Sequence, residues 1–290
     1  MLATFVIGLR EGLEAALIVG IVAAFLRREG RPDTIRLVWL GVGLAVAICA
    51  AVAIGLQLLS ASLPQVEQEM LETVISVVAV GMVTYMIVWM RRHARGLKGH
   101  LEGAAGAALV GGTAWALVAM AFLAVLREGF ETAVFLLAAF QASTSALAAG
   151  FGALAGIALA VGVGYGIYRG GVRINLARFF GLTGLVLVFV ASGLVASGLH
   201  TGHEAGWVQI GQATALDLSW LIQPGTPLAA LITGILGLQP KPAVIELIGW
   251  LAYFIPMSLF VMWPQRRSPR APSPVALDPA VDPAVSPTSR

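Results

Sequence analysis

Two short charged motifs hold the residues of this chain that are best suited to chemistry. Residues 9–19 read LREGLEAALIV and residues 126–136 read LREGFETAVFL. In each copy, the second glutamate lies three positions after the first glutamate and four after the arginine, so a helix would place both carboxylates on one side with the guanidinium at its edge. Carboxylates grouped in this way can bind a cation, and the guanidinium can neutralise an acid. The six residues are Arg10, Glu11, Glu14, Arg127, Glu128 and Glu131.

The charge balance of the two motifs favours ion binding over a purely structural role. Pairing each arginine with a glutamate of its own copy leaves two carboxylates, which need protons or a bound cation inside an apolar segment. Each charge at the centre of a bilayer costs on the order of 3 kcal/mol or more. We therefore predict that the four glutamates bind a metal ion and that the two arginines support them.

Ligand chemistry narrows the class of ion without identifying it. Carboxylate oxygens without thiolates or nearby imidazoles favour hard ions such as iron, manganese, magnesium or calcium over copper(I). A divalent-cation exchanger stays open as an alternative. A more remote alternative is an intramembrane lipid phosphatase, but its phosphate loop would need serine and arginine. The Pro224–Gly225 pair is followed by Thr-Pro-Leu, without arginine.

The elements that must position these motifs are membrane helices. The 290-residue chain is 58% hydrophobic and 11% charged, with a mean hydropathy of +0.88, as expected of an integral membrane protein. A bilayer-spanning helix needs about 20 apolar residues. We predict an all-α fold with seven such helices, near residues 2–26, 35–60, 71–90, 109–140, 150–168, 177–198 and 244–263.

The ends of the chain and its single cysteine add few constraints. The first apolar run follows the methionine without a basic leader, so we expect it to be retained rather than cleaved as a signal peptide. The lone Cys49 cannot form an internal disulfide.

The distribution of basic residues predicts the orientation of the helices. Arginines and lysines gather in alternate short loops, as the positive-inside rule expects of cytoplasmic loops. This pattern places the N-terminus outside and the C-terminus in the cytoplasm, and it makes nucleic acid an unexpected partner. The basic residues concerned are Arg27, Arg28, Arg31, Arg36, Arg91, Arg92, Arg95, Lys98, Arg169, Arg173, Arg178, Arg266, Arg267 and Arg270.

The repeated motif and the predicted topology together indicate an inverted repeat. Three helices form each unit, and because three is odd, the second unit enters the membrane in the opposite sense. Transporters of this architecture bind substrate near the midplane, where the repeats meet. The predicted organisation is a first repeat (1–100), a second repeat (101–198), an outer loop with a short re-entrant or interfacial segment (199–243), a seventh helix (244–263) and a disordered proline-rich cytoplasmic tail (264–290).

Acidic residues and histidines on the outer side are candidates for the entrance. Glu72 could guide an ion inward, although capping of its helix is an equally good interpretation. His200, His203 and Glu204 form a short cluster, HTGHE, which we expect to follow the sixth helix rather than to lie in it. Two histidines three residues apart outside a helix are a weak metal signal. Glu246 is a further outer acid, close to the start of the last helix.

The paired motifs resemble those of the oxidase-dependent iron permease family, which includes fungal high-affinity iron permeases and bacterial iron uptake permeases. The resemblance extends to TYMIVWMRRHARGLKGHL at residues 84–101 and to GLHTGHEAG at residues 198–206. It covers nearly the whole membrane region. Phe130 is the one departure within the second motif, where the family pattern has leucine.

The resemblance implies a transporter, rather than an enzyme, that imports iron across the plasma membrane, which in a bacterium is the inner membrane. Iron would be the transported ion, ferric or ferrous, and no cofactor is expected. A separate iron oxidase, or a periplasmic iron-binding or peroxidase-like protein, is the expected partner, because the permease lacks redox groups. A few relatives are associated with lead, so another heavy or hard metal remains an alternative cargo.

Overall fold

The computed structural model is all-helical over the residues that it describes, and no strand is present among them. It describes residues 1–28, 30, 32–93, 114–143, 145–169, 176–222, 226, 229, 232–236 and 239–263. The helices are α1 (Leu2–Arg28), α2 (Pro32–Ser62), α3 (Gln65–His93), α5 (Ala114–Gln141), α6 (Ala146–Tyr168), α7 (Leu176–Glu204), η1 (Ile232–Leu236, a π-helix) and α9 (Val244–Met262).

Seven of these elements are long α-helices that correspond to the seven predicted apolar runs. Five of them, α2, α3, α6, α7 and α9, are long and apolar enough to cross a membrane by length and composition. α1 and α5 contain 27 and 28 residues, and they are the two helices that carry the charged motifs. The charges that lower their apolar character are therefore the residues of the candidate site.

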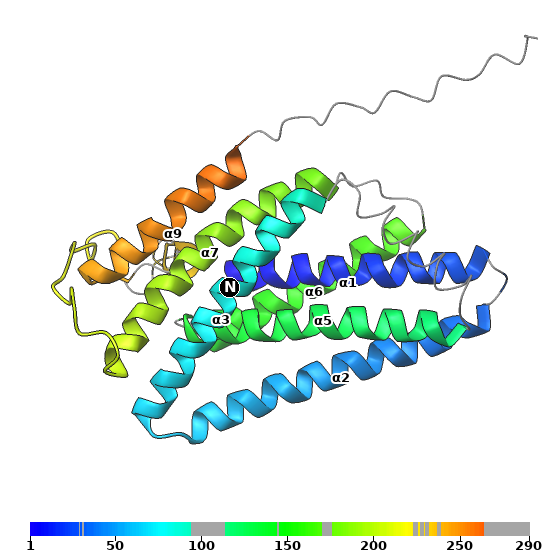
Figure 1. The fold of residues 1–290 in the computed structure, drawn as a ribbon, viewed down its shortest axis with the longest axis horizontal. Coiled ribbons are helices and arrows are strands. Elements are labelled where there is room, and N and C mark those ends of the chain that lie inside the picture. The colour runs from blue at the N-terminus through cyan, green and yellow to red at the C-terminus, as the bar shows by residue number, and fades with distance from the viewer. Residues whose placement is uncertain are drawn as a thin grey trace, which may run out of the picture.

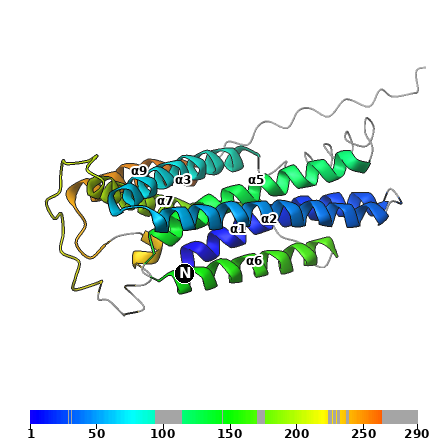
Figure 2. The ribbon, with the colours of Figure 1, turned by 90° about the horizontal axis from the view of Figure 1, so that it is seen from below.

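The helices pack in pairs that relate the first half of the chain to the second. The most extensive contacts join α1 to α6, α3 to α7 and α2 to α5, and α1 also packs against α5. Figures 1 and 2 show that α1, α3 and α6 run in one general direction through the bundle, whereas α2, α5 and α7 run in the other. Each helix of the series α5, α6, α7 thus runs opposite to its counterpart in the series α1, α2, α3.

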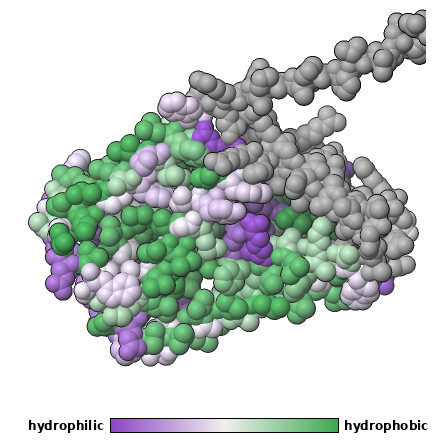
Figure 3. Space-filling model, in the orientation of Figure 1, coloured by the Kyte–Doolittle hydropathy of each residue, from purple (hydrophilic) through white to green (hydrophobic). Residues whose placement is uncertain are grey.

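The core lies between the helices that carry the motifs, and the outer helices expose apolar side chains. A large cluster of buried residues joins α1, α3, α5 and α7, and a smaller one joins α1, α2 and α5. Leu40 on α2, Leu154 on α6 and Leu259 on α9 are among the exposed large hydrophobic residues. The face in Figure 3 is accordingly mostly apolar, with few hydrophilic patches. Such a surface suits the hydrocarbon interior of a bilayer, so the protein is a multi-pass membrane protein.

Glycines permit the most extensive helix pairing, that of α1 with α6. A methyl group built on Gly8 would lie 2.8 Å from the carbonyl oxygen of Ala153, and one built on Gly164 would lie 2.6 Å from the Ala16 Cβ. A methyl group on Gly156 would collide with the backbone of Phe5. Small residues let membrane helices approach until their backbones touch. This contact fixes the depth of the first motif relative to α6.

The end of α7 corrects the sequence-based expectation for the HTGHE cluster. The predicted helix stops at residue 198, but α7 continues to Glu204, so His200, His203 and Glu204 lie in its last turns. Gly206, with φ of +80°, follows the helix and donates its N–H to the His203 carbonyl at 2.8 Å. The apolar run ends before the helix because polar residues can extend a helix beyond the hydrocarbon region. The stop is set by a glycine in the left-handed conformation.

Several predicted features lie wholly or largely outside the described residues. They include the tail at 264–290 and the basic loops that contain Arg95, Lys98 and Arg173. Half of the apolar segment 227–238 is also outside them, because only residue 229 and η1 are described there. The described part of the outer segment folds back on itself, because the Ala215 N–H bonds to the Pro242 carbonyl and the Val244 N–H bonds to the Ala213 carbonyl, each at 2.9 Å.

Candidate metal site

The two motifs meet in the interior of the bundle through the contact between α1 and α5. Glu11, Glu128 and Glu131 each offer a carboxylate oxygen, and these three oxygens lie within 4.8 Å of one another. Glu11 and Glu128 are buried, and Glu131 is half-buried. Three carboxylate oxygens at this spacing can converge on one cation, and among the described residues this is the one group of three or more ligand side chains placed to hold a metal ion.

Within each motif, the arginine also forms an ion pair with the glutamate one helical turn after it. Arg10 Nε lies 3.5 Å from Glu14 Oε1, and Arg127 Nε donates to Glu131 Oε1 at 2.9 Å. The two arginines differ in their surroundings. The Arg10 side chain is 1% exposed and also lies over the Phe180 ring at 5.9 Å, whereas the Arg127 side chain is 55% exposed. The first motif is therefore closed off, and the second is open on one side.

Glu11 and Glu128 take part in neither of these two ion pairs. Both oxygens of Glu11 and Oε2 of Glu128 are buried and have no hydrogen-bond partner among the described residues. A buried carboxylate without a partner is costly, because it has lost its hydration and gained nothing in return. These orphaned oxygens belong to the same group that converges within 4.8 Å. A bound cation would satisfy them.

The structure gives Glu14 a different place from the other three glutamates. All four were predicted as ligands, but Glu14 is next to Arg10 and lies outside the group of three convergent oxygens. Glu131 belongs to that group although it is also paired with Arg127. The spacing of the motif could not separate these two cases, because both second glutamates lie at the same distance in sequence from the arginine and the first glutamate of their copy.

The glycine inside each motif serves the packing of its helix. A methyl group on Gly12 would lie 2.8 Å from the Ala160 Cβ on α6. One on Gly129 would lie 2.8 Å from Cys49 Sγ on α2. The two halves thus use the same motif position for equivalent contacts. A neighbouring helix therefore approaches the backbone closely at both glycines.

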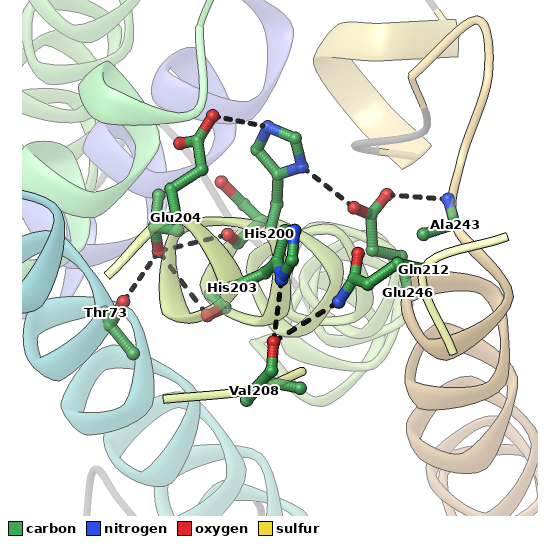
Figure 4. A network of polar contacts seen from close by, with 11 residues as sticks. Thr73, His200, His203, Glu204, Val208, Gln212, Ala243 and Glu246 are labelled. Carbon is green, nitrogen blue, oxygen red and sulfur yellow. Dashed lines mark hydrogen bonds and ion pairs between the residues drawn. The ribbon is translucent and has the colours of Figure 1, made fainter. Parts of the chain in front are cut away.

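The candidate entrance residues are divided between separate contacts near the start of α3 and the end of α7. Glu72 is half-buried on α3, where its Oε1 accepts a hydrogen bond from Gln68 Nε2 at 3.0 Å. His203 Nδ1 lies 2.7 Å from the Val208 carbonyl, so it points away from His200 (Figure 4). The predicted three-residue cluster of His200, His203 and Glu204 does not assemble as one group of ligands.

His200 instead joins two carboxylates from different helices. Its Nδ1 lies 2.9 Å from Glu246 Oε1 on α9, and its Nε2 lies 3.4 Å from Glu204 Oε1 on α7. Glu246 appears in the sequence only as one of several outer acids, so its contact with His200 was missed. The available signal was its position in the first turn of a helix after a proline, where an acid is held by free backbone N–H groups.

Comparisons with known proteins identify the family of this chain. Residues 1–266 match the Iron permease FTR1 family. The ferrous iron permease EfeU of Yersinia pestis is 42% identical over 268 residues, which are 92% of this chain and 95% of the relative. The protein of the same name from Yersinia pseudotuberculosis is 43% identical over 264 residues, covering 90% and 92% of the two chains. The one from Escherichia coli O6:K15:H31 is 42% identical over 268 residues, covering 92% and 97%.

No solved structure matches the chain. The relatives cover nearly the full length of both sequences, and the family match includes both charged motifs. The proteins concerned are permeases, which excludes the intramembrane phosphatase alternative. This chain is a transporter rather than an enzyme, and it belongs to the iron permease FTR1 family.

Proposed function

We propose that this protein imports iron across the bacterial inner membrane through a carboxylate site formed by Glu11, Glu128 and Glu131. The observation that supports this most directly is the convergence of one carboxylate oxygen from each of these three glutamates. Glu11 and Glu128 also have buried oxygens without a hydrogen-bond partner among the described residues. Membership of the iron permease family supports iron as the cargo. Oxygen ligands of this kind suit iron, and they also suit manganese and calcium.

Charge balance supports the ferrous form of the cargo. With Arg10 beside Glu14 and Arg127 beside Glu131, two negative charges remain on Glu11 and Glu128. One divalent cation neutralises them, whereas a ferric ion would leave an excess positive charge in a buried site. The relatives are named ferrous iron permeases, which agrees with this assignment. A separate oxidase or periplasmic partner remains a prediction that the ferrous assignment does not require.

The architecture that we propose for transport is a 3+3 inverted repeat followed by a seventh spanning helix. The opposed directions of α1 and α5, of α2 and α6, and of α3 and α7 support this assignment. α1 and α5 would each be roughly 40 Å long at about 1.5 Å per residue, which is sufficient to span a bilayer. In this topology the N-terminus lies outside and the C-terminus in the cytoplasm. The site lies where the repeats meet, and rocking of one repeat against the other would expose it alternately to each side.

The test is uptake of radioactive iron into proteoliposomes that contain the purified chain. Ferrous iron is supplied anaerobically with ascorbate, and ferric citrate is supplied in parallel. We expect ferrous uptake by the wild type and a loss of at least about tenfold in Glu128→Gln, which keeps the size of the side chain but removes its charge. Competition with manganese and calcium measures the selectivity. Unchanged uptake in Glu128→Gln would show that the site assignment is wrong, and stronger uptake of manganese than of iron would show that the cargo is wrong.

A further inference from the structure

A second group of metal-ligating side chains lies at the outer ends of α7 and α9, apart from the two motifs. His200 and Glu204 are one turn apart on α7, and Glu246 reaches His200 from the first turn of α9 (Figure 4). The His200 and Glu204 side chains are 36% and 43% exposed, whereas that of Glu246 is only 6% exposed. The group therefore has an open side formed by two ligand-type residues and a buried side formed by one carboxylate.

The buried carboxylate determines which nitrogen of His200 is available. Glu246 Oε2 accepts the Ala243 N–H at 3.3 Å, which fixes the carboxylate at the start of α9, and Oε1 lies 2.9 Å from His200 Nδ1. An ionised carboxylate only accepts hydrogen bonds, so in the neutral imidazole Nδ1 carries the proton and Nε2 keeps its lone pair. Histidines that bind metals are typically oriented in this way, with the second ring nitrogen donating to a carboxylate.

The available nitrogen faces a carboxylate oxygen at a distance that suits a shared metal ion. His200 Nε2 and Glu204 Oε1 are 3.4 Å apart. Metal bonds to imidazole nitrogen and carboxylate oxygen are about 2.1 Å long, so two ligands of one tetrahedral ion would be roughly 3.4 Å apart. The exposed side leaves the remaining coordination positions to water. Imidazole with carboxylate selects divalent first-row transition metals over calcium or magnesium.

We propose that His200 and Glu204 form an outer binding site for a divalent first-row cation and that Glu246 is its positioning residue. With two protein ligands the site holds the ion weakly, which lets the ion move on toward the interior. Glu69 on α3 adds negative potential around His200. The role of this site in loading the permease rests on the proposed function, but the binding itself does not.

His203 provides a matched control within the same helix. It is three residues from His200, but its Nδ1 contacts the Val208 carbonyl at 2.7 Å. His203 is therefore held by the loop that follows α7. Replacing it removes one imidazole from the same end of the helix without touching the proposed ligands.

The first experiment detects imidazole bound to manganese(II), used as the probe ion. The full-length chain without a histidine tag is placed in lipid nanodiscs, and pulsed electron paramagnetic resonance records the nitrogen modulation of bound Mn²⁺. The motif site contains carboxylates alone, so it gives no such signal. We expect modulation in the wild type and in His203→Gln, and its loss in His200→Gln. Absence of modulation in the wild type, or its persistence in His200→Gln, would overturn the proposal.

The second experiment tests the positioning role of Glu246. In Glu246→Leu, His200 loses its acceptor, and we expect Mn²⁺ to bind the nitrogen-containing site at least about tenfold more weakly. Glu246→Gln retains an oxygen acceptor and should recover most of this loss. A merely structural role would leave the affinity of the folded variants at the wild-type value, which would refute the positioning role.

The same measurement in Glu128→Gln separates this proposal from the proposed function. This variant lacks one motif ligand but keeps the outer site, so we expect normal nitrogen modulation together with lost iron uptake. If uptake persists while the modulation depends on His200, the motif assignment fails and the outer site stands. If modulation is lost in Glu128→Gln, the bound ion was not at the outer site and the proposal fails.

Discussion

The packing of Gly129 against Cys49 on α2 gives a sharp steric prediction for Gly129→Ala. The new methyl group would lie 2.8 Å from Cys49 Sγ and 3.3 Å from Cys49 Cβ on α2. Non-bonded heavy atoms of this kind prefer about 3.5–4.0 Å, so the contact must open by roughly 0.7 Å or more. Rotation of the thiol is not free, because Cys49 Sγ donates to the Leu126 carbonyl at 3.5 Å. We expect a destabilisation of about 1–3 kcal/mol.

The same clash should impair transport, because Gly129 lies between two of the proposed ligands. Pushing α5 away from α2 shifts Glu128 and Glu131 relative to Glu11, and the three oxygens now lie within 4.8 Å. Iron uptake into proteoliposomes and thermal unfolding of the purified variants should therefore decline together. Gly55→Ala is the control on α2, since a methyl group there would meet nothing within 4 Å.

A double-mutant cycle distinguishes this explanation from a general effect of the substitution. Cys49→Ala removes the sulfur that the new methyl group would strike, leaving only the tight contact with Cβ. In the double variant Gly129→Ala/Cys49→Ala, we expect recovery of at least about 1 kcal/mol relative to the sum of the two single changes. Two single effects that add within about 0.5 kcal/mol would refute the steric reasoning.

Two further contrasts compare residues of the same type that have different surroundings. Arg10→Met should destabilise the protein by about 3–5 kcal/mol, because it leaves Glu14 buried without its cation. Arg127→Met, at an exposed side chain, should cost less than about 1 kcal/mol in the same chemical denaturation assay. Equal losses would contradict the difference in burial. Gly156→Ala should weaken the contact of α6 with α1. Gly162→Ala should be neutral or stabilising by up to about 1 kcal/mol, because a methyl group built there has nothing within 4 Å. Thermal unfolding compares the two variants, and equal stability of both would be inconsistent with the packing.

The sequence was sufficient for the number and approximate position of the long helices. A bilayer demands continuous apolar segments, so the predicted runs and the observed α-helices correspond one to one. The sequence was less informative at the helix ends. α3 begins at Gln65 rather than near residue 71, and α7 continues to Glu204, because a helix can extend past the hydrocarbon region into polar surroundings. Apolar composition indicates which residues cross the hydrocarbon region, whereas caps and turns determine where the helix begins and ends.

For the candidate site, local spacing identified the charged face of each motif but not the contacts between the two. The repeat in the sequence and the cost of buried charge were enough to predict a site built from both copies. Which of the four glutamates converge on the candidate metal site depends on how the helices pack. Glu14 and Glu131 hold the same position in their motifs, but only Glu131 joins Glu11 and Glu128. The spacing within one helix is identical in both copies, and the distance between helices is not encoded in it.

What the sequence by itself determined was the membrane class, the helices, the paired motifs and the family to which they belong. Each of these follows from local composition or from a pattern that a single segment carries. The tertiary structure alone decided that Arg10 is enclosed while Arg127 is open, that Cys49 packs against Gly129, and that Glu246 reaches His200. These contacts join segments dozens of residues apart or more, and they arise when apolar helices and small residues are packed together. Side-chain distances between helices are a property of that packing.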